Sequence, residues 1–105
     1  MKIFITGVAG FLGSHLADLM ISEGHTVAGN DNMIGGYTDN VPQNVEFHQV
    51  DCCDLENMTR AMEGCDIVYH TAATAYEGLS VFSPVLVTRN IFEASVTTIT
   101  AAIRN

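Results

Sequence analysis

Basic side chains are scarce in this sequence, and their scarcity limits the partners that the chain can hold. The 105 residues include four lysines and arginines against twelve aspartates and glutamates, so the formal net charge is −8. A surface of that charge repels the phosphates of nucleic acids and of anionic membranes. The sequence therefore argues against both as partners. An anionic ligand stays compatible with it where backbone N–H groups bind that ligand.

Long apolar runs are missing as well. No uninterrupted apolar stretch approaches the roughly 18 residues that a membrane-spanning helix needs. The apolar segment at the N-terminus is broken by Gly7 and is too short for the core of a signal peptide. We therefore expect a soluble, cytoplasmic protein. With 48% hydrophobic residues, the chain can still build a modest core in one small domain or a piece of one.

Cysteine occurs three times, in a pattern that does not suit a disulfide framework or a zinc site. Cys52 and Cys53 are adjacent, Cys65 stands apart, and no Cys-x-x-Cys spacing occurs. No histidine or basic residue adjoins the vicinal pair to lower a thiol pKa. We expect buried or half-buried thiols in a reducing compartment, without a catalytic role.

The histidines also lack a metal-binding spacing. None of the four stands in a His-x-x-x-His pair, and the expected secondary structure places them on different elements. We therefore expect structural roles, and no metal site, for His15, His25, His48 and His70.

Short β-branched and aromatic segments alternate with segments of helical periodicity along the chain. The expected strands are Lys2–Thr6, Thr26–Asn30, Val45–Val50 and Asp66–His70. The expected helices run from Phe11 to Glu23, from a cap at Asp54 to a stop at Gly64, and from Ser83-Pro84 to Arg104. Loops are expected at Asp31–Asn44 and Thr71–Leu79. This alternation predicts an α/β fold, in which right-handed βα units form a parallel sheet.

Three glycines, Gly7, Gly10 and Gly13, stand between the first expected strand and the first expected helix. In such a strand–turn–helix unit, Gly7 permits the tight turn and Gly10 lets the backbone approach a pyrophosphate. Gly13 lets the helix pack closely on the sheet, and the N-terminal N–H groups of that helix attract phosphates. Because glycine triplets also arise by chance, the context is what makes this one indicate a dinucleotide site.

Asp31 completes that context. It lies 18 positions after Gly13, at the end of the second expected strand, about where a carboxylate would bind an adenosine ribose. As a loop residue alone it would start an Asx turn, and no particular distance would be expected. A carboxylate there accepts a free 2′-hydroxyl and repels a 2′-phosphate, and no lysine or arginine lies between Lys2 and Arg60. The sequence therefore favours NAD over NADP.

Four motifs in this order resemble the extended short-chain dehydrogenase/reductase family: TGVAGFLGSHL, the Asp31-Asn32 pair, DCCD after the third strand, and VYHTAA around the fourth. More narrowly, the sequence is similar to the NAD-dependent epimerases and dehydratases of nucleotide sugars, UDP-glucose 4-epimerases among them. The resemblance runs from Lys2 to about Asn90. It implies a Rossmann-type sheet of about four strands in the order 3-2-1-4, within a single NAD(P)-binding domain over residues 1–105. We expect this domain to be incomplete, because the chain ends before the family's fifth strand.

The resemblance also implies which residues contact the cofactor. The pyrophosphate loop corresponds to Gly7, Gly10, Phe11, Leu12 and Gly13. Asp31 and Asn32 correspond to the contacts with the adenosine ribose. His70 belongs to the family's His-x-Ala-Ala pattern, as a packing or loop-shaping residue.

Further along the chain, Asp51 and Cys52 correspond to the pair that meets the adenine ring. Without that role, Asp51 would be a loop carboxylate near the Asp54 cap. The loop that passes the nicotinamide ribose corresponds to Thr71, Ala72 and Ala73. Asn90 corresponds to a family asparagine that helps to order the site, and is otherwise an exposed helix residue.

The family's catalytic Tyr-x-x-x-Lys pair is absent. The residues four positions after Tyr37, Tyr69 and Tyr76 are Val41, Ala73 and Ser80, and the single lysine is Lys2. The chain also departs from the family's Asn-Val-x-Gly-Thr pattern after Asn90, where Glu93 replaces the glycine. This substitution predicts that the last helix packs differently here.

Taken together, the resemblance implies the NAD-binding part of a nucleotide-sugar epimerase or dehydratase, which removes a hydride from a sugar carbon and returns it through NAD. We expect no turnover from this chain alone, and nucleotide-sugar binding only if the missing C-terminal part is supplied. Two alternatives stay open: a non-catalytic dinucleotide-binding or sensor module, and an assembly module. The fourth strand would lack a neighbour on one edge, so we also expect self-association by edge pairing, helix packing or exchange of the last helix.

Overall fold

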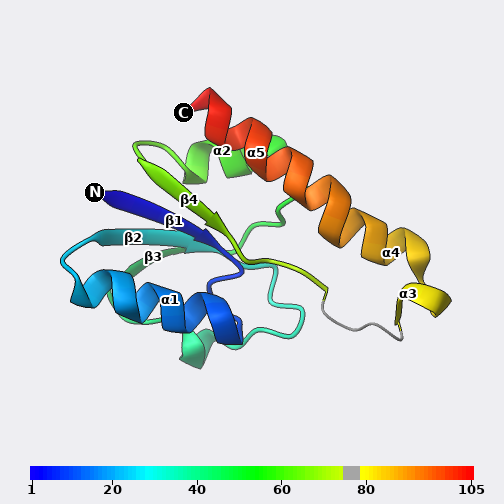
Figure 1. Cartoon of the computed structure of the whole chain (residues 1–105), viewed down its shortest axis with the longest axis horizontal. Helices are drawn as coiled ribbons and strands as arrows, with labels where there is room; N and C mark the ends of the chain where they lie inside the picture. Colours follow the sequence, from blue (N-terminus) through cyan, green and yellow to red (C-terminus); the bar gives the residue numbers. More distant parts are fainter. Residues whose placement is uncertain (75–78) are drawn as a thin grey trace.

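The computed structural model describes residues 1–74 and 79–105 of the chain. Its sheet contains the strands β1 (Lys2–Thr6), β2 (Thr26–Asn30), β3 (Val45–His48) and β4 (Ile67–His70). The strands are parallel and lie in the order β3-β2-β1-β4, which confirms the predicted Rossmann-type arrangement (Figure 1). All four carboxyl ends therefore meet at one edge of the sheet.

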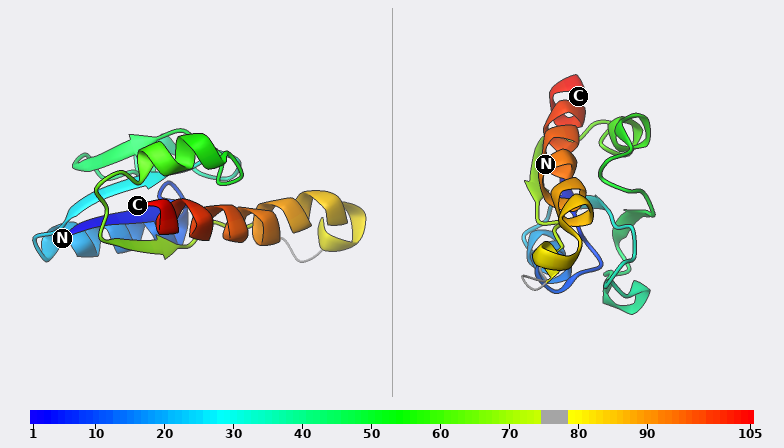
Figure 2. Two further views of the ribbon diagram at one scale, coloured as in Figure 1. Left: turned by 90° about the horizontal axis from the view of Figure 1, so that it is seen from above. Right: turned by 90° about the vertical axis from the view of Figure 1, so that its right-hand side faces the viewer.

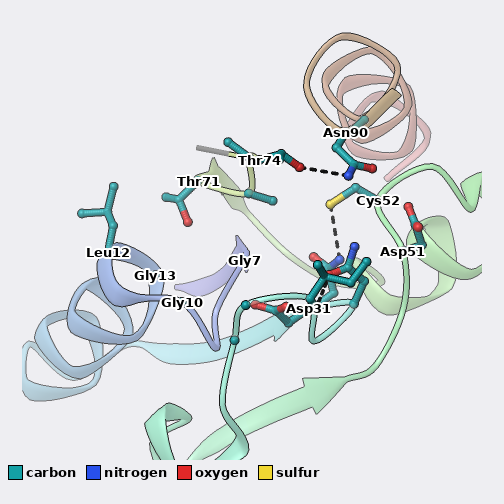
Figure 3. A pocket seen from close by; sticks show the side chains of 18 of the residues that line it. Gly7, Gly10, Leu12, Gly13, Asp31, Asp51, Cys52, Thr71, Thr74 and Asn90 are labelled. Carbon is teal, nitrogen blue, oxygen red and sulfur yellow. Dashed lines mark hydrogen bonds between the residues drawn. The ribbon is translucent and has the colours of Figure 1, made fainter. Parts of the chain in front are cut away.

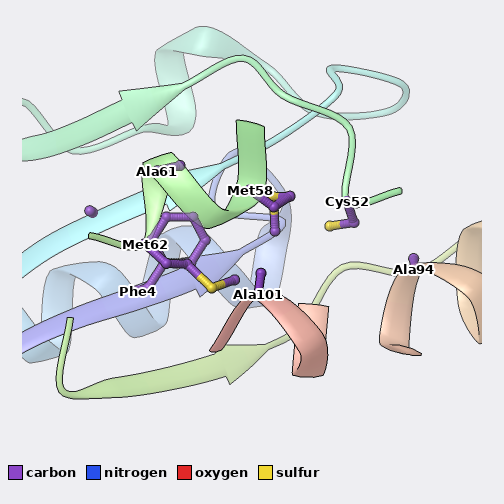
Figure 4. Close-up of a cluster of buried hydrophobic side chains, with 8 residues drawn as sticks. Phe4, Cys52, Met58, Ala61, Met62, Ala94 and Ala101 are labelled. Carbon is purple, nitrogen blue, oxygen red and sulfur yellow. The ribbon is translucent and has the colours of Figure 1, made fainter. Parts of the chain in front are cut away.

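Helices cover both faces of the sheet, because consecutive residues of β1 are apolar and successive side chains of a strand point to opposite faces. Ile3 and Ile5 pack toward α1 (Phe11–Ser22), in a cluster that also contains Val8, Ala17 and Val27. Phe4 points the other way, toward α2 (Leu55–Ala61) and α5 (Ala94–Arg104). Figure 4 shows Phe4 among Met58, Met62 and Ala101.

The first two helices begin and end close to the predicted residues. Gly24, with φ +89°, donates its N–H to the carbonyl of Ile21 just past the end of α1. Asp54 caps α2 through an Oδ1 that accepts the N–H of Asn57 at 3.2 Å. Gly64 follows α2 with φ +77°, as expected for the residue that stops it.

The last helix is less regular than predicted. A separate short helix, α3 (Leu79–Phe82), begins at a residue that was expected in the loop. Ser83 then breaks the helical path with ψ +63°, and its side chain makes no capping hydrogen bond. The remaining helix consists of α4 (Pro84–Thr88), a π-helical turn η2 (Arg89–Glu93) and α5, and it ends at Arg104 as expected.

Two other boundaries differ from the prediction. β3 ends at His48, two residues early, because the N–H of Val50 turns back to the carbonyl of His48. A short 3-10 turn, η1 (Thr38–Asn40), lies within the predicted loop after β2. Residues 75–78, which include Tyr76, lie outside the described residues.

The molecule is elongated, with extents of 42 × 29 × 17 Å. In Figures 1 and 2, the helical segment that contains α4 extends well past the edge of the sheet, while α5 lies beside α2. Over the parts of the chain that the structure describes, no helix is both long enough and apolar enough to cross a membrane.

Candidate functional site

A cavity of about 390 Å³ lies at the carboxyl ends of the four strands. Figure 3 shows residues from all of these strand ends around it. Every residue that the sequence assigns to a cofactor lines this cavity: Gly7, Gly10, Phe11, Leu12, Gly13, Asp31, Asn32, Asp51, Cys52, Thr71, Ala72, Ala73 and Asn90. The fold thus brings together residues that are up to 83 positions apart in the chain.

The glycine turn leaves no room for side chains. Gly7 has φ +70°, and a Cβ on it would lie 2.9 Å from Cα of Ala72 in the loop after β4. A Cβ on Gly13 would overlap the carbonyl oxygen of Gly7. The close approach that Gly13 permits is therefore to the turn after β1, which is more specific than the predicted packing on the sheet.

The first turn of α1 provides unpaired donors to the cavity. Gly10 is its N-cap and carries no side chain that could cap the helix. The N–H groups of Phe11, Leu12 and Gly13 therefore have no acceptor within the helix, and these three residues line the cavity. Donors and helix dipole together favour an anion at this position, even in a chain of net charge −8.

Asp31 joins two backbone segments at the cavity wall. Its side chain is 8% exposed. Oδ2 accepts the N–H of Ala9 at 3.1 Å, and Oδ1 accepts the N–H of Met33 at 2.8 Å. The loop after β2 also returns to the glycine turn, where Tyr37 donates its N–H to the carbonyl of Ala9. Each carboxylate oxygen keeps a further lone pair, so Asp31 can still accept hydroxyl groups from a ligand.

Three of the four basic side chains are paired with carboxylates other than Asp31. Lys2 lies at the opposite end of β1, where its Nζ is 3.2 Å from Oε2 of Glu46. Arg104 pairs with Glu56, and Arg89 pairs with Asp51. These three cations are thus engaged away from Asp31.

Asp51 is held from two directions. Its Oδ1 accepts the N–H of Cys53 at 2.8 Å, and its Oδ2 lies 3.1 Å from Nη1 of Arg89. Burial would raise the pKa of Asp51, but the bond from Cys53 and the Arg89 guanidinium together hold that pKa below its ordinary value. The carboxylate is therefore an ionised acceptor, and Arg89 links it to η2.

The cysteines are free thiols with raised pKa values. Burial raises the pKa of Cys52, whose Sγ lies 3.4 Å from Nδ2 of Asn30. Burial raises the pKa of Cys53 to about 11, although the charge of Arg89 acts in the opposite direction. The sequence argument that no cation lies near the pair was therefore wrong, since the fold brings Arg89 to it. The thiols are nevertheless mainly protonated at neutral pH, which makes them weak nucleophiles.

The loop after β4 is bound to β1 and to the last helix. Thr71 donates its hydroxyl to the carbonyl of Thr6, and the N–H of Ala72 donates to Oγ1 of Thr6 at 3.1 Å. Asn90 donates from Nδ2 to Oγ1 of Thr74 at 2.9 Å, as Figure 3 shows. Asn90 is therefore a half-buried wall residue, and the alternative of a simple exposed helix position is wrong.

A π-helical turn, η2, which the sequence did not predict, contains Glu93. A π turn holds one more residue than an α turn, and such turns often occur at functional sites. Here η2 contains both Asn90, which faces the cavity, and Arg89, which reaches Asp51.

Sequence reasoning missed several wall residues: Asn30, Ile34, Gly35, Gly36, Thr74 and Ala94. Asn30 donates from Nδ2 to the carbonyl of Val50 at 2.8 Å and so ties β2 to the loop after β3. A polar residue at the end of an otherwise apolar strand was a signal that could have identified it. Thr74 gave no such signal, because its partner Asn90 is 16 positions away.

The histidines lie on separate elements, as predicted. Among residues 1–74 and 79–105, no group of three or more histidine, cysteine, aspartate or glutamate side chains could hold a metal ion. His15 bonds to the carbonyl of Phe11 within α1, and His25 lies beside the N-terminal amino group.

Comparisons with known proteins identify this arrangement. A family model described as the NAD dependent epimerase/dehydratase family matches residues 3–105. The chain is 38% identical over 73 residues to GDP-mannose 3,5-epimerase of Arabidopsis thaliana, a match that covers 70% of this chain and 19% of that protein. It is 35% identical over 75 residues to UDP-N-acetyl-alpha-D-glucosaminuronate decarboxylase of Bacillus cytotoxicus, a match that covers 69% of this chain and 23% of that protein.

Solved structures show the same fold. UDP-glucose 4-epimerase of Thermotoga maritima, crystallised with UDP-glucose, superposes with a TM-score of 0.95 at 32% identity, over 99% of this chain and 34% of that chain. The UDP-glucose 4-epimerase of Thermus thermophilus in complex with NAD gives a TM-score of 0.91 at 36% identity, over 96% of this chain and 33% of that chain. The chain thus spans about a third or less of the length of these relatives. It belongs to the NAD-dependent epimerase/dehydratase family.

Proposed function

We propose that this chain binds NAD in the cavity at the carboxyl ends of its strands. The observation that carries the proposal is the glycine turn without room for a Cβ, which opens onto unpaired helix N–H groups with Asp31 beside it. The first turn of α1 would hold the pyrophosphate, and Asp31 with Asn32 would hold the adenosine ribose. Asp51 and Cys52 would face the adenine, while Thr71, Ala72, Ala73 and Asn90 would line the nicotinamide side.

The preference for NAD over NADP follows from charge. Asp31 would repel a 2′-phosphate, and the basic side chains Lys2, Arg89 and Arg104 are engaged with other carboxylates. The same Asp31 accepts the 2′-hydroxyl of NAD through its remaining lone pairs.

The parent reaction that we propose is the epimerisation or dehydration of a nucleotide sugar. When bound, NAD accepts a hydride from a sugar carbon and returns it. Within the 105 residues, no tyrosine is followed four positions later by lysine. We therefore propose that this chain binds the cofactor without turning over a sugar, which a further polypeptide segment would have to bind.

A second candidate is a dinucleotide-binding or sensor module without chemistry. The observation that favours it is the combination of a cavity lined by every predicted cofactor residue with the missing Tyr-x-x-x-Lys pair. Turnover of UDP-sugars by the chain after addition of NAD would exclude this candidate.

Titration calorimetry with NAD, NADP and UDP-sugars tests the proposal. We expect NAD to bind, NADP to bind more weakly, and UDP-sugars not to bind. Asp31→Ala should weaken NAD binding by about tenfold to a hundredfold, because a hydrogen bond to a charged group is lost. Asp39→Ala is the matched control: it removes the same charge from an exposed position of η1 that does not line the cavity.

Asp31→Ala also removes acceptors for Ala9 and Met33, so thermal melts of each variant must accompany the titrations. A wild-type chain that is folded but binds neither dinucleotide would overturn the proposal.

A cytoplasmic location of the protein stays a prediction.

We also propose that the chain self-associates. One side of α4, η2 and α5 carries exposed apolar residues at helical spacing: Val85, Phe92, Val96, Ile99 and Ile103. This set, called the apolar stripe below, would face solvent in a monomer. In the described sheet, β4 is also an edge strand with unpaired backbone groups.

A further inference from the structure

His70, which is not among the proposed cofactor contacts, joins a chain of hydrogen bonds that reaches two of them, Ala72 and Asn90. Its Nδ1 lies 2.7 Å from Oγ1 of Thr6 on β1. Its Nε2 lies 3.0 Å from Oγ of Ser95 on α5. The imidazole ring of His70 therefore connects β1, in the centre of the sheet, to α5 in the last helix, directly below the wall of the cavity.

The neighbouring bonds assign the tautomer. Ser95 donates its hydroxyl to the carbonyl of Ile91, so its oxygen is left to accept a proton from Nε2 of His70. Thr6 accepts the N–H of Ala72 on Oγ1, and its hydroxyl proton can then donate to Nδ1 of His70. All donors and acceptors match when His70 is neutral and carries its proton on Nε2.

Together with short stretches of backbone, these hydrogen bonds form a closed path around one wall of the cavity, called the hydrogen-bond ring below. From Thr6 the path leads through Ala72 to Thr74, which accepts Nδ2 of Asn90. From Asn90 it continues along η2 to the carbonyl of Ile91, and through Ser95 back to His70. His70 is the one titratable side chain named in this path.

We propose that neutral His70 is a positioning residue for the cofactor site, and that its protonation loosens the wall formed by residues 71–74 and Asn90. This inference rests on the proposed binding of NAD. An imidazolium would donate from both nitrogens, so Nδ1 would point a proton at the hydroxyl proton of Thr6. The Thr6 hydroxyl would lose its acceptor, and the bond that orients Ala72 would weaken.

The surroundings of His70 support a neutral ring. His70 as a whole is exposed, but the partial burial of its ring lowers its pKa. Beside it lie Thr6, Ser95 and the uncharged lining of a second cavity, of about 330 Å³: Val68, Thr98, Ile99, Ala102 and Ile103.

Charged groups on the packed elements are directed elsewhere. Lys2 and Asp66 lie at the opposite ends of β1 and β4 and bond there to Glu46 and to the Lys2 backbone. Arg104 of α5 pairs with Glu56. Glu93 of η2 lies toward the cation of Arg89 and the thiol of Cys53.

An NMR titration of the isotope-labelled wild-type chain tests the hydrogen-bond ring without any ligand. The ¹⁵N shifts of His70 should show the Nε2–H tautomer at pH 8, and the pKa of His70 should lie below the ordinary value for histidine. The amide signals of Ala72 and Ser95 should shift with the His70 pKa. An Nδ1–H tautomer, or an Ala72 amide signal that does not shift as His70 titrates, would overturn the inference.

Calorimetry then tests whether the hydrogen-bond ring affects the binding of NAD. NAD affinity of the wild-type chain should fall as the pH is lowered from 7.5 to 5.5, by up to about tenfold for a pKa coupling of one unit. His70→Asn keeps an amide oxygen near the place of Nδ1 and cannot titrate, so its affinity should be nearly independent of pH. His25→Gln replaces a histidine far from the cavity and should retain the wild-type pH profile.

Ser95→Ala removes the hydroxyl that accepts Nε2 of His70 and so breaks the hydrogen-bond ring at its other side. This variant should bind NAD more weakly at pH 7.5, whereas Ser95→Thr should restore the binding.

The outcomes separate the two proposals. Absence of NAD binding at pH 7.5 contradicts the proposed function. In that case the NMR titration still tests whether the hydrogen-bond ring responds to the protonation of His70. NAD binding whose pH profile is unchanged in His70→Asn contradicts the positioning role alone. If His70→Asn does not fold, the Ser95 pair and the wild-type titration decide.

Discussion

Single residues at this site serve two neighbours at once. Asp31 holds the N–H of Ala9 and the N–H of Met33 with the same carboxylate that faces the cavity. Gly13 has no space for a Cβ because the carbonyl oxygen of Gly7 occupies it. A substitution at either position therefore changes the shape of the turn as well as the surface offered to a ligand.

Gly13→Ala tests this close approach. A methyl group there must displace the turn after β1, and overpacking of this kind costs about 1–3 kcal/mol in the free energy of unfolding. Urea unfolding should show this loss, and NAD binding should weaken with it. Gly24→Ala is the control: its φ of +89° is strained for alanine, but no atom lies within 4 Å of the added Cβ. Gly24→Ala should lower stability and leave NAD affinity unchanged; equal effects of both variants on affinity would contradict the argument.

Individual helices differ in how far their own sequence explains them. α2 has an Asp54 cap at its start and Gly64 after its end, so local signals define it. The helix from Pro84 to Arg104 has proline at its start, but its π-helical turn at Arg89–Glu93 coincides with bonds to other elements. Its irregularity therefore coincides with a tertiary contact rather than with a local capping signal.

The Asp54 cap gives a prediction for α2. Asp54→Ala removes the acceptor for the N–H of Asn57, and we expect a loss of about 1 kcal/mol in the free energy of unfolding. Asp54→Asn keeps a side-chain oxygen and should retain most of the stability. Chemical denaturation at neutral pH measures both. A stability of Asp54→Ala equal to that of the wild type would show that the cap is not needed.

At the scale of the whole molecule, the apolar stripe is an exposed apolar surface within the described residues. Its members are between 50% and 81% exposed. Their positions follow one another at intervals of 7, 4, 3 and 4 residues, which places them on one side of the helix. In Figures 1 and 2 part of this helix extends past the sheet, where a second molecule can reach it.

Light scattering coupled to size-exclusion chromatography tests the proposed self-association. The wild-type chain should show a mass above that of the 11.3 kDa monomer at high concentration. Ile103→Glu, which places a charge in the apolar stripe, should shift the mass toward the monomer without lowering the melting temperature. Leu19→Glu on α1 is the control, because Leu19 is 51% exposed but lies outside the stripe. A wild-type monomer at all concentrations would contradict the proposal.

The sequence by itself determined the features that depend on neighbours along the chain. The glycine turn between β1 and α1, the position of Asp31, the cap at Asp54 and the stop at Gly64 follow from local backbone preferences, and the structure places them as expected. The parallel sheet follows from the alternation of strand and helix, because successive βα units cross over in one hand. These signals operate within a few residues and need no knowledge of remote contacts.

The tertiary structure decided which distant side chains meet. Arg89 reaches Asp51 across 38 positions, Asn30 ties β2 to Val50, and His70 joins Thr6 to Ser95. No spacing rule in the sequence predicts such pairs, because they arise where the ends of separate strands and one helix converge. Sequence thus determined where a dinucleotide site could form, and packing determined how its walls are held, since a hydrogen bond between remote residues exists only after the chain has folded.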